Sequence, residues 1–302
     1  MFGNELTEHP ANRAIVLRNV NCPYCGNALD KKTSTKEHVV GRRFVPKGKL
    51  HAQWNLIFNA CQPCNNRKAD LEDDIAAITL QPDLSGETGH GDAEVTRQAQ
   101  ARAKKSISRR TRKPVEDSRE NIEFSLPLGI GVTANFEFTA PAQSDEARLL
   151  ELARLHLIGF FYMLTFKPEE RRGYYWPGGY HPVNHCNRGD WGNPQITGFA
   201  EAVVNWEPRL MASTALGFFK CCIRRHPNAD CWSWALEWNQ NARIVGFFGD
   251  RDSAQTVVNS LPPLSAHRIS LGEKDYLGFR TETPLNGTDL LFHWDGPVIA
   301  ED

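Results

Sequence analysis

The chain has 302 residues, a formal net charge of -1 and a 40% share of hydrophobic residues. This composition is typical of a soluble globular protein, and it excludes the global basic excess of a protein that coats DNA, so any nucleic-acid contact must come from local patches. The length predicts two domains, or one domain with an appended module.

The first predicted element is a short strand within residues 11–20, and two Cys-x-x-Cys pairs follow it. Cys22 and Cys25 form the first pair, and Cys61 and Cys64 form the second. Two such pairs, separated by an insert long enough to fold, have the spacing of a tetrahedral four-thiolate zinc site, which is normally structural. A disulfide is disfavoured without a secretory segment, and ordinary core cysteines are disfavoured by the doubled spacing. We therefore predict structural Zn²⁺ on these four thiolates.

The residues between and beside the pairs suggest a family. Glu37-His38 lies in the insert, Asn55 follows, and the second pair runs directly into Asn65-Asn66-Arg67-Lys68. This order resembles the HNH endonuclease family, whose pattern is an acidic residue with His, then Asn, then Cys-x-x-Cys-His/Asn-x-x-Lys. The resemblance covers about residues 15–80 and has Asn at the last position, as an HNN variant. It implies a compact, treble-clef-like ββα-metal unit braced by zinc.

The residue types also fit phosphodiester hydrolysis. His is the side chain that accepts a proton near neutrality, so we predict His38 as the general base. Hard cations such as Mg²⁺ or Mn²⁺ take carboxylate and amide oxygens, so Glu37 and Asn65 are the predicted catalytic-metal ligands. The resemblance gives Asn55 the role of orienting the loop that carries the base.

Other interpretations of these residues stay open. Asn65 also suits a turn or a helix cap, and Glu37 also suits a solvated acid. His51 is an alternative base that lacks an adjacent acid. Six basic residues nearby are predicted to contact phosphates, with an ordinary solvated surface as the alternative: Arg42, Arg43, Lys47, Lys49, Arg67 and Lys68.

A helix over residues 71–80 is expected to close a nuclease domain of residues 1–81. Residues 82–118 are then predicted to be a basic linker. Residues 82–91 are rich in turn formers, and residues 97–113 hold eight basic residues and no acidic one. Drawn as a helix, this stretch places Arg102, Lys105, Arg109 and Arg112 on one face. A nucleic-acid contact and a solubilising connector are equally compatible with it.

Residues 119–302 are predicted to form a second, α+β domain of unassigned topology. Alternation around Gly129-Ile130-Gly131 predicts a hairpin over 121–138, and an apolar stripe predicts a helix over 144–166. Strands are expected at 216–225, 231–238 and 244–248, a helix at 253–261, and an irregular aromatic loop at 173–180. We expect this domain to serve targeting, regulation or assembly, through a protein partner or a small-molecule activator.

The remaining cysteines and two histidines carry weaker predictions. Cys186, Cys221, Cys222 and Cys231 lack paired spacing and are expected to be reduced core thiols. A second metal site on His181, His185 and Cys186 is a less favoured alternative.

Together these patterns predict an α+β, metal-dependent DNA endonuclease. Family analogy suggests the effector of a bacterial anti-phage defence or restriction system. The alternative is a non-catalytic, zinc-containing nucleic-acid-binding or adaptor module, against which the intact Glu37 and His38 argue. Residues 1–20 hold no signal-peptide core and no apolar run spans a membrane, so we expect a cytoplasmic protein with no membrane association.

Overall fold

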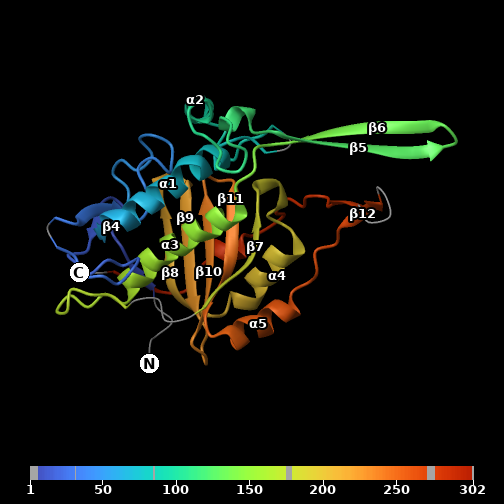
Figure 1. Ribbon diagram of the computed structural model, residues 1–302. Helices are drawn as coiled ribbons and strands as arrows, with labels where there is room; N and C mark the ends of the chain where they lie inside the picture. The colour runs from blue at the N-terminus through green and yellow to red at the C-terminus, as the bar shows by residue number, and fades with distance from the viewer. Residues whose placement is uncertain (1–5, 31, 84–85, 175–178, 271–275, 301–302) are drawn as a thin grey trace.

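A computed structural model describes residues 6–30, 32–83, 86–174, 179–270 and 276–300. Its largest sheet has five antiparallel strands in the order β7-β11-β10-β9-β8. The α-helices and this sheet make most of the body, which is drawn in Figure 1. The strands are β7 (Gly179–Cys186), β8 (Glu207–Thr214), β9 (Phe219–Arg225), β10 (Cys231–Trp238) and β11 (Ala242–Gly249).

Strand alternation gives the sheet two apolar faces, which pack against different helices. Trp234 and Trp238 face one core together with α3 (Glu146–Leu164). Ala235 and Phe247 belong to a second core with α4 (Pro194–Val203) and α5 (Arg251–Ser260). The expected helices at 144–166 and 253–261 and the three expected strands are therefore present.

The N-terminal part is a smaller sheet followed by a helix. β2 (Ala14–Val16) pairs in parallel with β4 (Asn55–Cys61), and β3 (Ser34–His38) pairs antiparallel on its other side. The chain then enters α1 (Gln62–Thr79) directly from β4, with Pro63 in the first turn, where its missing N–H leaves no hydrogen bond unmade. The expected helix at 71–80 is thus the second half of a longer one.

Residues 82–118 pack on the body, in contrast to the predicted linker. α2 (Ala93–Ala103) is capped by Asp92 and buries Val95, Ala99 and Ala103 at a four-residue spacing. Because such a stripe needs a partner surface, α2 lies against α1. The helix ends at Ala103, so the helical face expected to hold Arg102, Lys105, Arg109 and Arg112 does not form.

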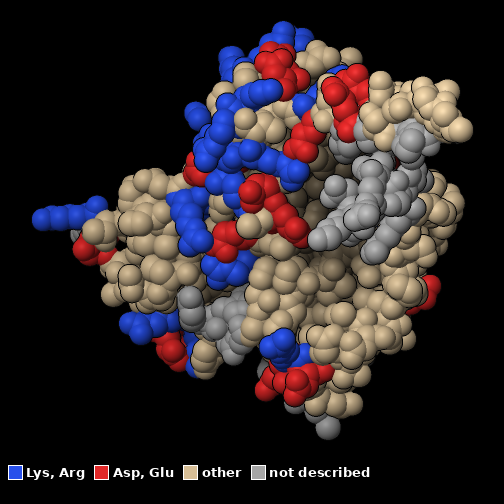
Figure 2. Space-filling model, turned by 45° about the vertical axis from the view of Figure 1, so that its right-hand side comes forward, with Lys and Arg blue, Asp and Glu red and all other residues tan. Residues whose placement is uncertain are grey.

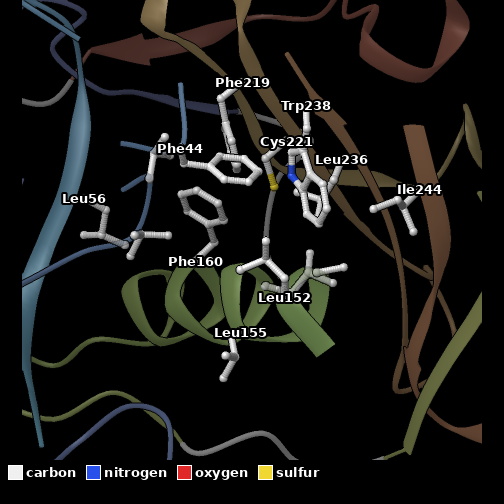
Figure 3. Packing of buried hydrophobic residues seen from close by; sticks show 14 of the residues in the cluster. Phe44, Leu56, Leu152, Leu155, Phe160, Phe219, Cys221, Leu236, Trp238 and Ile244 are labelled. Atoms are coloured by element: carbon white, nitrogen blue, oxygen red, sulfur yellow. The ribbon is translucent and has the colours of Figure 1, made fainter. Parts of the chain in front are cut away.

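A continuous core crosses the expected domain boundary at residue 81. Phe44 and Leu56 of the N-terminal part, Phe160 of α3, and Phe219 and Trp238 of the large sheet belong to one cluster of buried residues. Figure 3 shows Phe44, Phe160 and Phe219 lying close together between α3 and the sheet. The N- and C-terminal parts are therefore expected to unfold together.

A long two-stranded arm leaves the body between α2 and α3. It consists of β5 (Glu120–Gly129) and β6 (Val132–Ala140), as the alternation around Gly129-Ile130-Gly131 predicts. Figure 1 shows the arm extending far beyond the other elements. Two short pairs complete the described strands: β1 (Leu6–Glu8) with β14 (Val298–Ala300), and β12 (His267–Ser270) with β13 (Tyr276–Phe279).

Part of the expected aromatic loop at 173–180 belongs to β7 instead. Tyr180 lies in this edge strand and stacks on Trp234 with ring centroids 5.5 Å apart. Pro182 lies beside the bulge opposite Gly246, a place where an edge strand tolerates a residue without an N–H. Residues 175–178 lie outside the described ranges.

The mixed α+β class is confirmed, whereas the arrangement as separate domains is replaced by one shared core. Among the helices in the described ranges, none has the length and apolar character needed to cross a membrane.

Gly159 lies where the N-terminal and C-terminal parts pack together, so a substitution there tests the shared core. A Cβ at this position of α3 would lie 2.8 Å from Val39 Cγ2. We expect Gly159→Ala to lower the free energy of unfolding by about 1–3 kcal/mol, because overpacking outweighs the higher helix propensity of Ala. Urea unfolding followed by circular dichroism should show one transition, and Val39→Ala should recover part of the loss in the double variant. Two separate transitions would contradict the shared core.

Candidate metal centre and adjoining cleft

The first thiol pair sits in a tight turn. The Gly26 N–H donates to Cys22 O at 2.8 Å and the Cys22 N–H donates to Asn27 O at 2.8 Å. Gly26 has a φ of 75°, a left-handed conformation that glycine adopts without strain. This reversal brings Cys22 and Cys25 to one side of the chain.

The second pair comes from the junction of β4 and α1. Cys61 ends the strand and caps the helix, and Cys64 lies in the first turn. Burial acts to raise the pKa of the Cys61 thiol, but hydrogen bonds from the backbone and side chain of Cys64 lower it overall. Burial raises the pKa of the Cys64 thiol.

The four sulfurs come together as predicted. Their Sγ atoms all lie within 4.8 Å of one another, and Cys25 Sγ lies 3.7 Å from Cys61 Sγ. Tetrahedral zinc with Zn–S bonds of about 2.3 Å requires sulfurs about 3.8 Å apart. The cluster could therefore hold a metal such as zinc. Burial raises the pKa of the Cys22 thiol to about 11, so metal binding there would release protons.

The other cysteines do not form a comparable group. Cys186, Cys221, Cys222 and Cys231 are buried free thiols. Across the described ranges, the four-cysteine cluster is the one place where three or more His, Cys, Asp or Glu ligand atoms converge. The alternative site on His181, His185 and Cys186 is thus not formed.

A cleft of ≈ 260 Å³ lies beside α1 and collects most of the predicted catalytic residues. His51 is exposed and does not line it. The lining residues come from β3, the following loop, α1 and α2: Lys36, Glu37, His38, Gly41, Arg42, Arg43, Asn65, Ala69, Glu72, Asp73 and Arg102.

His38 ends β3 and is half-buried at the wall of this cleft. Its Nε2 is enclosed and makes no hydrogen bond within the described part of the chain. Burial, together with the positive charges of Arg42 and Lys36, lowers the pKa of His38. The neutral imidazole, which can accept a proton, therefore predominates near neutral pH.

Asn55 fixes the loop that follows His38. Its Nδ2 donates to Val40 O at 2.9 Å, and its Oδ1 accepts from the Val40 N–H at 3.2 Å. Both backbone groups of Val40 are thus held by one buried side chain. These are the side-chain to backbone contacts expected for Asn55.

Asn65 faces β3 from the first turn of α1. Its Nδ2 donates to Thr35 Oγ1 at 2.8 Å and to Lys36 O at 3.4 Å. The amide orientation that these contacts fix leaves Oδ1 as an acceptor beside the cleft.

Glu37 is buried and charge-paired, which rules out the alternative interpretation as a solvated acid. Its Oε1 lies 2.9 Å from Lys68 Nζ and accepts from Tyr24 Oη at 3.1 Å. Burial raises the pKa of Glu37, and the Lys68 charge opposes that rise.

Lys68 does not serve as a surface phosphate contact, which corrects the prediction for this residue. Its side chain is 1% exposed and lies 2.6 Å from Glu72 Oε1. It also donates to His38 O at 3.1 Å. Lys68 therefore ties α1 to the end of β3, beneath the cleft.

The charged network continues into α3. His156 is fully buried and its Nε2 lies 3.7 Å from Glu72 Oε1. Burial lowers the pKa of His156 to about 4. Phe44, Phe219 and Trp238 surround its ring.

The other five predicted phosphate contacts divide into two groups. Arg42 and Arg43 are exposed and line the cleft, and Lys47 is exposed nearby. Lys49 pairs with Asp92 at 2.9 Å and Arg67 pairs with Glu151 at 2.9 Å. Figure 2 shows one face of the molecule, on which Lys and Arg side chains gather in a band with Asp and Glu among them.

Four charged residues of the cleft were not predicted as site residues: Lys36, Glu72, Asp73 and Arg102. Glu72 follows Lys68 by four residues, so helical spacing was an available signal. Asp73 is its neighbour. Arg102 belonged to a recognised basic stretch, but only the packing of α2 brings it to the cleft, where it donates to Arg43 O.

Removing one thiol should remove the metal. We expect Cys61→Ser to lose bound zinc and much of its folded structure, because metal affinity contributes folding free energy. Zinc content per chain, measured by mass spectrometry of the metal, should stay at one in Cys186→Ser. A folded Cys61→Ser protein that retains a full zinc equivalent would contradict the assignment.

His156 should make stability depend on pH. Its pKa is about 4 in the folded protein and about 6.5 when unfolded. The unfolded state thus binds more protons between these values, and stability falls as the pH drops from about 6.5 towards 4, by up to about 3 kcal/mol. Urea titrations should show a shallower fall in His156→Phe and the wild-type fall in His51→Phe. If stability fell equally with pH in all three proteins, the predicted contribution of His156 would be refuted.

Comparison with protein-family models, with curated proteins and with solved structures finds no match for this chain.

Proposed function

We propose that this protein is a metal-dependent endonuclease of the HNH type that hydrolyses DNA phosphodiester bonds at the His38 cleft. The observation that carries the proposal is the position of His38, a mainly neutral imidazole at the wall of a charged cleft, with its loop clamped by Asn55. The succession of β3, β4 and α1, joined by four clustered thiols, supports the family resemblance.

In this proposal His38 accepts a proton from water as the water attacks phosphorus. Asn55 acts as a positioning residue, because its two hydrogen bonds to Val40 fix the backbone close to His38. Arg42, Arg43 and Arg102 supply positive charge along the cleft. Guanidinium groups hold phosphate oxygens in a fixed geometry, so they would orient the scissile phosphate.

The oxygen donors beside His38 fit a hard divalent cation. Asn65 offers Oδ1, because Thr35 holds its Nδ2, and Glu37 offers its carboxylate, of which Lys68 and Tyr24 contact Oε1. Carboxylate and amide oxygens favour Mg²⁺ or Mn²⁺ over softer ions. When bound, such a cation stabilises charge on the phosphate and the leaving oxygen.

A second candidate function is a non-catalytic nucleic-acid-binding or adaptor module. The Glu37–Lys68 ion pair favours it, since a carboxylate that neutralises a buried lysine is less available to a cation. A role in bacterial anti-phage defence or restriction remains part of the nuclease proposal and rests on family analogy.

The nuclease is tested by cleavage of plasmid and single-stranded DNA. Zinc-loaded protein with Mg²⁺ or Mn²⁺ should cut, and EDTA should stop cutting. His38→Ala should reduce the rate at least about 100-fold, the usual contribution of a positioned base. His51→Ala is the matched control, since this exposed histidine lies outside the cleft.

The outcomes separate the two functions. Equal cutting by His38→Ala and His51→Ala would remove His38 from the mechanism. DNA binding without cutting by the wild-type protein would favour the adaptor module.

A further inference from the structure

We propose that Glu72 is a positioning residue of the cation site, where it holds the Lys68 ammonium group so that the Glu37 carboxylate can serve a divalent cation. This inference rests on the proposed function, which places the cation on Glu37 and Asn65. It accounts for the ion pair between Glu37 and Lys68, a contact that opposes this placement.

The Lys68 ammonium group is shared between two carboxylates. Its Nζ lies 2.6 Å from Glu72 Oε1 and 2.9 Å from Glu37 Oε1, and it donates to His38 O at 3.1 Å. An ammonium group has three N–H donors, so all three acceptors can be served at once. Because the side chain of Lys68 is 1% exposed, its charge needs a carboxylate partner at all times.

The two carboxylates differ in how they are attached relative to Lys68. Glu72 follows Lys68 by one turn of α1, so this pair stays together wherever β3 lies. Glu37 belongs to β3, and its ion pair with Lys68 joins two different elements. When the Glu37 carboxylate turns towards a cation, Lys68 therefore keeps Glu72 as its partner.

Other contacts hold the Glu72 carboxylate in place. The Gly41 N–H donates to Glu72 Oε1 at 3.2 Å, and His156 Nε2 lies 3.7 Å from the same oxygen. Burial lowers the pKa of His156 to about 4, so its ring is neutral near neutral pH. His156 thus supports Glu72 without competing with Lys68 for the negative charge.

The charges of this group also favour a divalent cation. Two carboxylates share one ammonium group, which leaves one negative charge in excess, and this excess attracts a cation to Glu37. Without the charge of Glu72 the remaining pair would be neutral. A cation would then have to take Glu37 from a buried ammonium group that has no other carboxylate, so Glu72 makes Glu37 available without being a ligand itself.

Manganese binding to the zinc-loaded full chain, followed by electron paramagnetic resonance of free Mn²⁺, tests the proposal. Glu72→Gln should raise the Kd for Mn²⁺ about 10-fold, the usual cost of losing a residue that supports a metal ligand. Asp73→Asn is the matched control, since it removes one negative charge from an exposed residue of the same cleft. Its Kd should change less than about 3-fold, because water and salt screen an exposed charge.

The double variant Lys68→Met/Glu72→Gln separates positioning from direct ligation. With the ammonium group also removed, Glu37 has no competing partner, so the Kd should return to the wild-type value or fall below it. Lys68→Gln/Glu72→Gln serves in its place if the Met variant does not retain its zinc. A Kd that stays raised in a folded, zinc-loaded double variant would overturn the proposal, as would a wild-type Kd in Glu72→Gln.

The same titration distinguishes this inference from the proposed function. Glu37→Gln should abolish Mn²⁺ binding, because it removes the charged ligand. If the wild-type protein binds no Mn²⁺, or Glu37→Gln binds it with the wild-type Kd, both the cation site and the role of Glu72 are wrong. If Glu37→Gln loses Mn²⁺ while Glu72→Gln keeps the wild-type Kd, only the role of Glu72 is wrong.

Discussion

The site depends on the ion pairs that the buried ammonium group of Lys68 makes with two carboxylates. The ammonium group lies between Glu37 of β3 and Glu72 of α1 and also contacts the backbone oxygen of His38. Three charges in a nearly dry environment are costly unless they neutralise one another. Loss of Lys68 would leave two carboxylates facing each other without a counter-charge. The network therefore holds the end of β3 at a fixed distance from α1, and with it the position of His38.

The thiol cluster and the shared core hold the same helix from its other sides. Cys61 and Cys64 fix the start of α1, while α3 packs along it and brings His156 to Glu72. The cleft is thereby built on rigid elements, an arrangement that keeps side chains within a narrow range of geometry. Because α3 also covers the large sheet, a change in the C-terminal part can reach the cleft through direct packing. The role expected for residues 119–302 in targeting, regulation or assembly stays a prediction.

Much of the local structure could be predicted because its signals are short-range. The doubled Cys-x-x-Cys spacing predicts the thiol cluster, period-two alternation predicts the arm, and an apolar stripe with an acidic start predicts α3. Asn55 was assigned its backbone contacts by family pattern, and the structure shows them. The nuclease chemistry stays a prediction, since it depends on a bound cation and a substrate.

The predictions that the structure corrects are those that depend on long-range packing. Lys68 is predicted as a phosphate contact because it belongs to a cluster of basic residues around the thiol motif, and only tertiary packing buries it between Glu37 and Glu72. Composition marked residues 82–118 as a linker, although Val95, Ala99 and Ala103 already show a buried stripe. β7 was missed in part because Pro182 and the glycines around it resemble a loop, whereas an edge strand tolerates them.

The central claim is that the His38 cleft binds a divalent cation and a phosphodiester. Anomalous diffraction from crystals of the zinc-loaded His38→Ala protein, soaked with Mn²⁺ and a short DNA duplex, measures this directly. The account predicts zinc at the four thiols and manganese about 2.2 Å from oxygens of Glu37 and Asn65, with a phosphate beside it. Manganese and DNA absent from the cleft of a folded, zinc-loaded protein would contradict it.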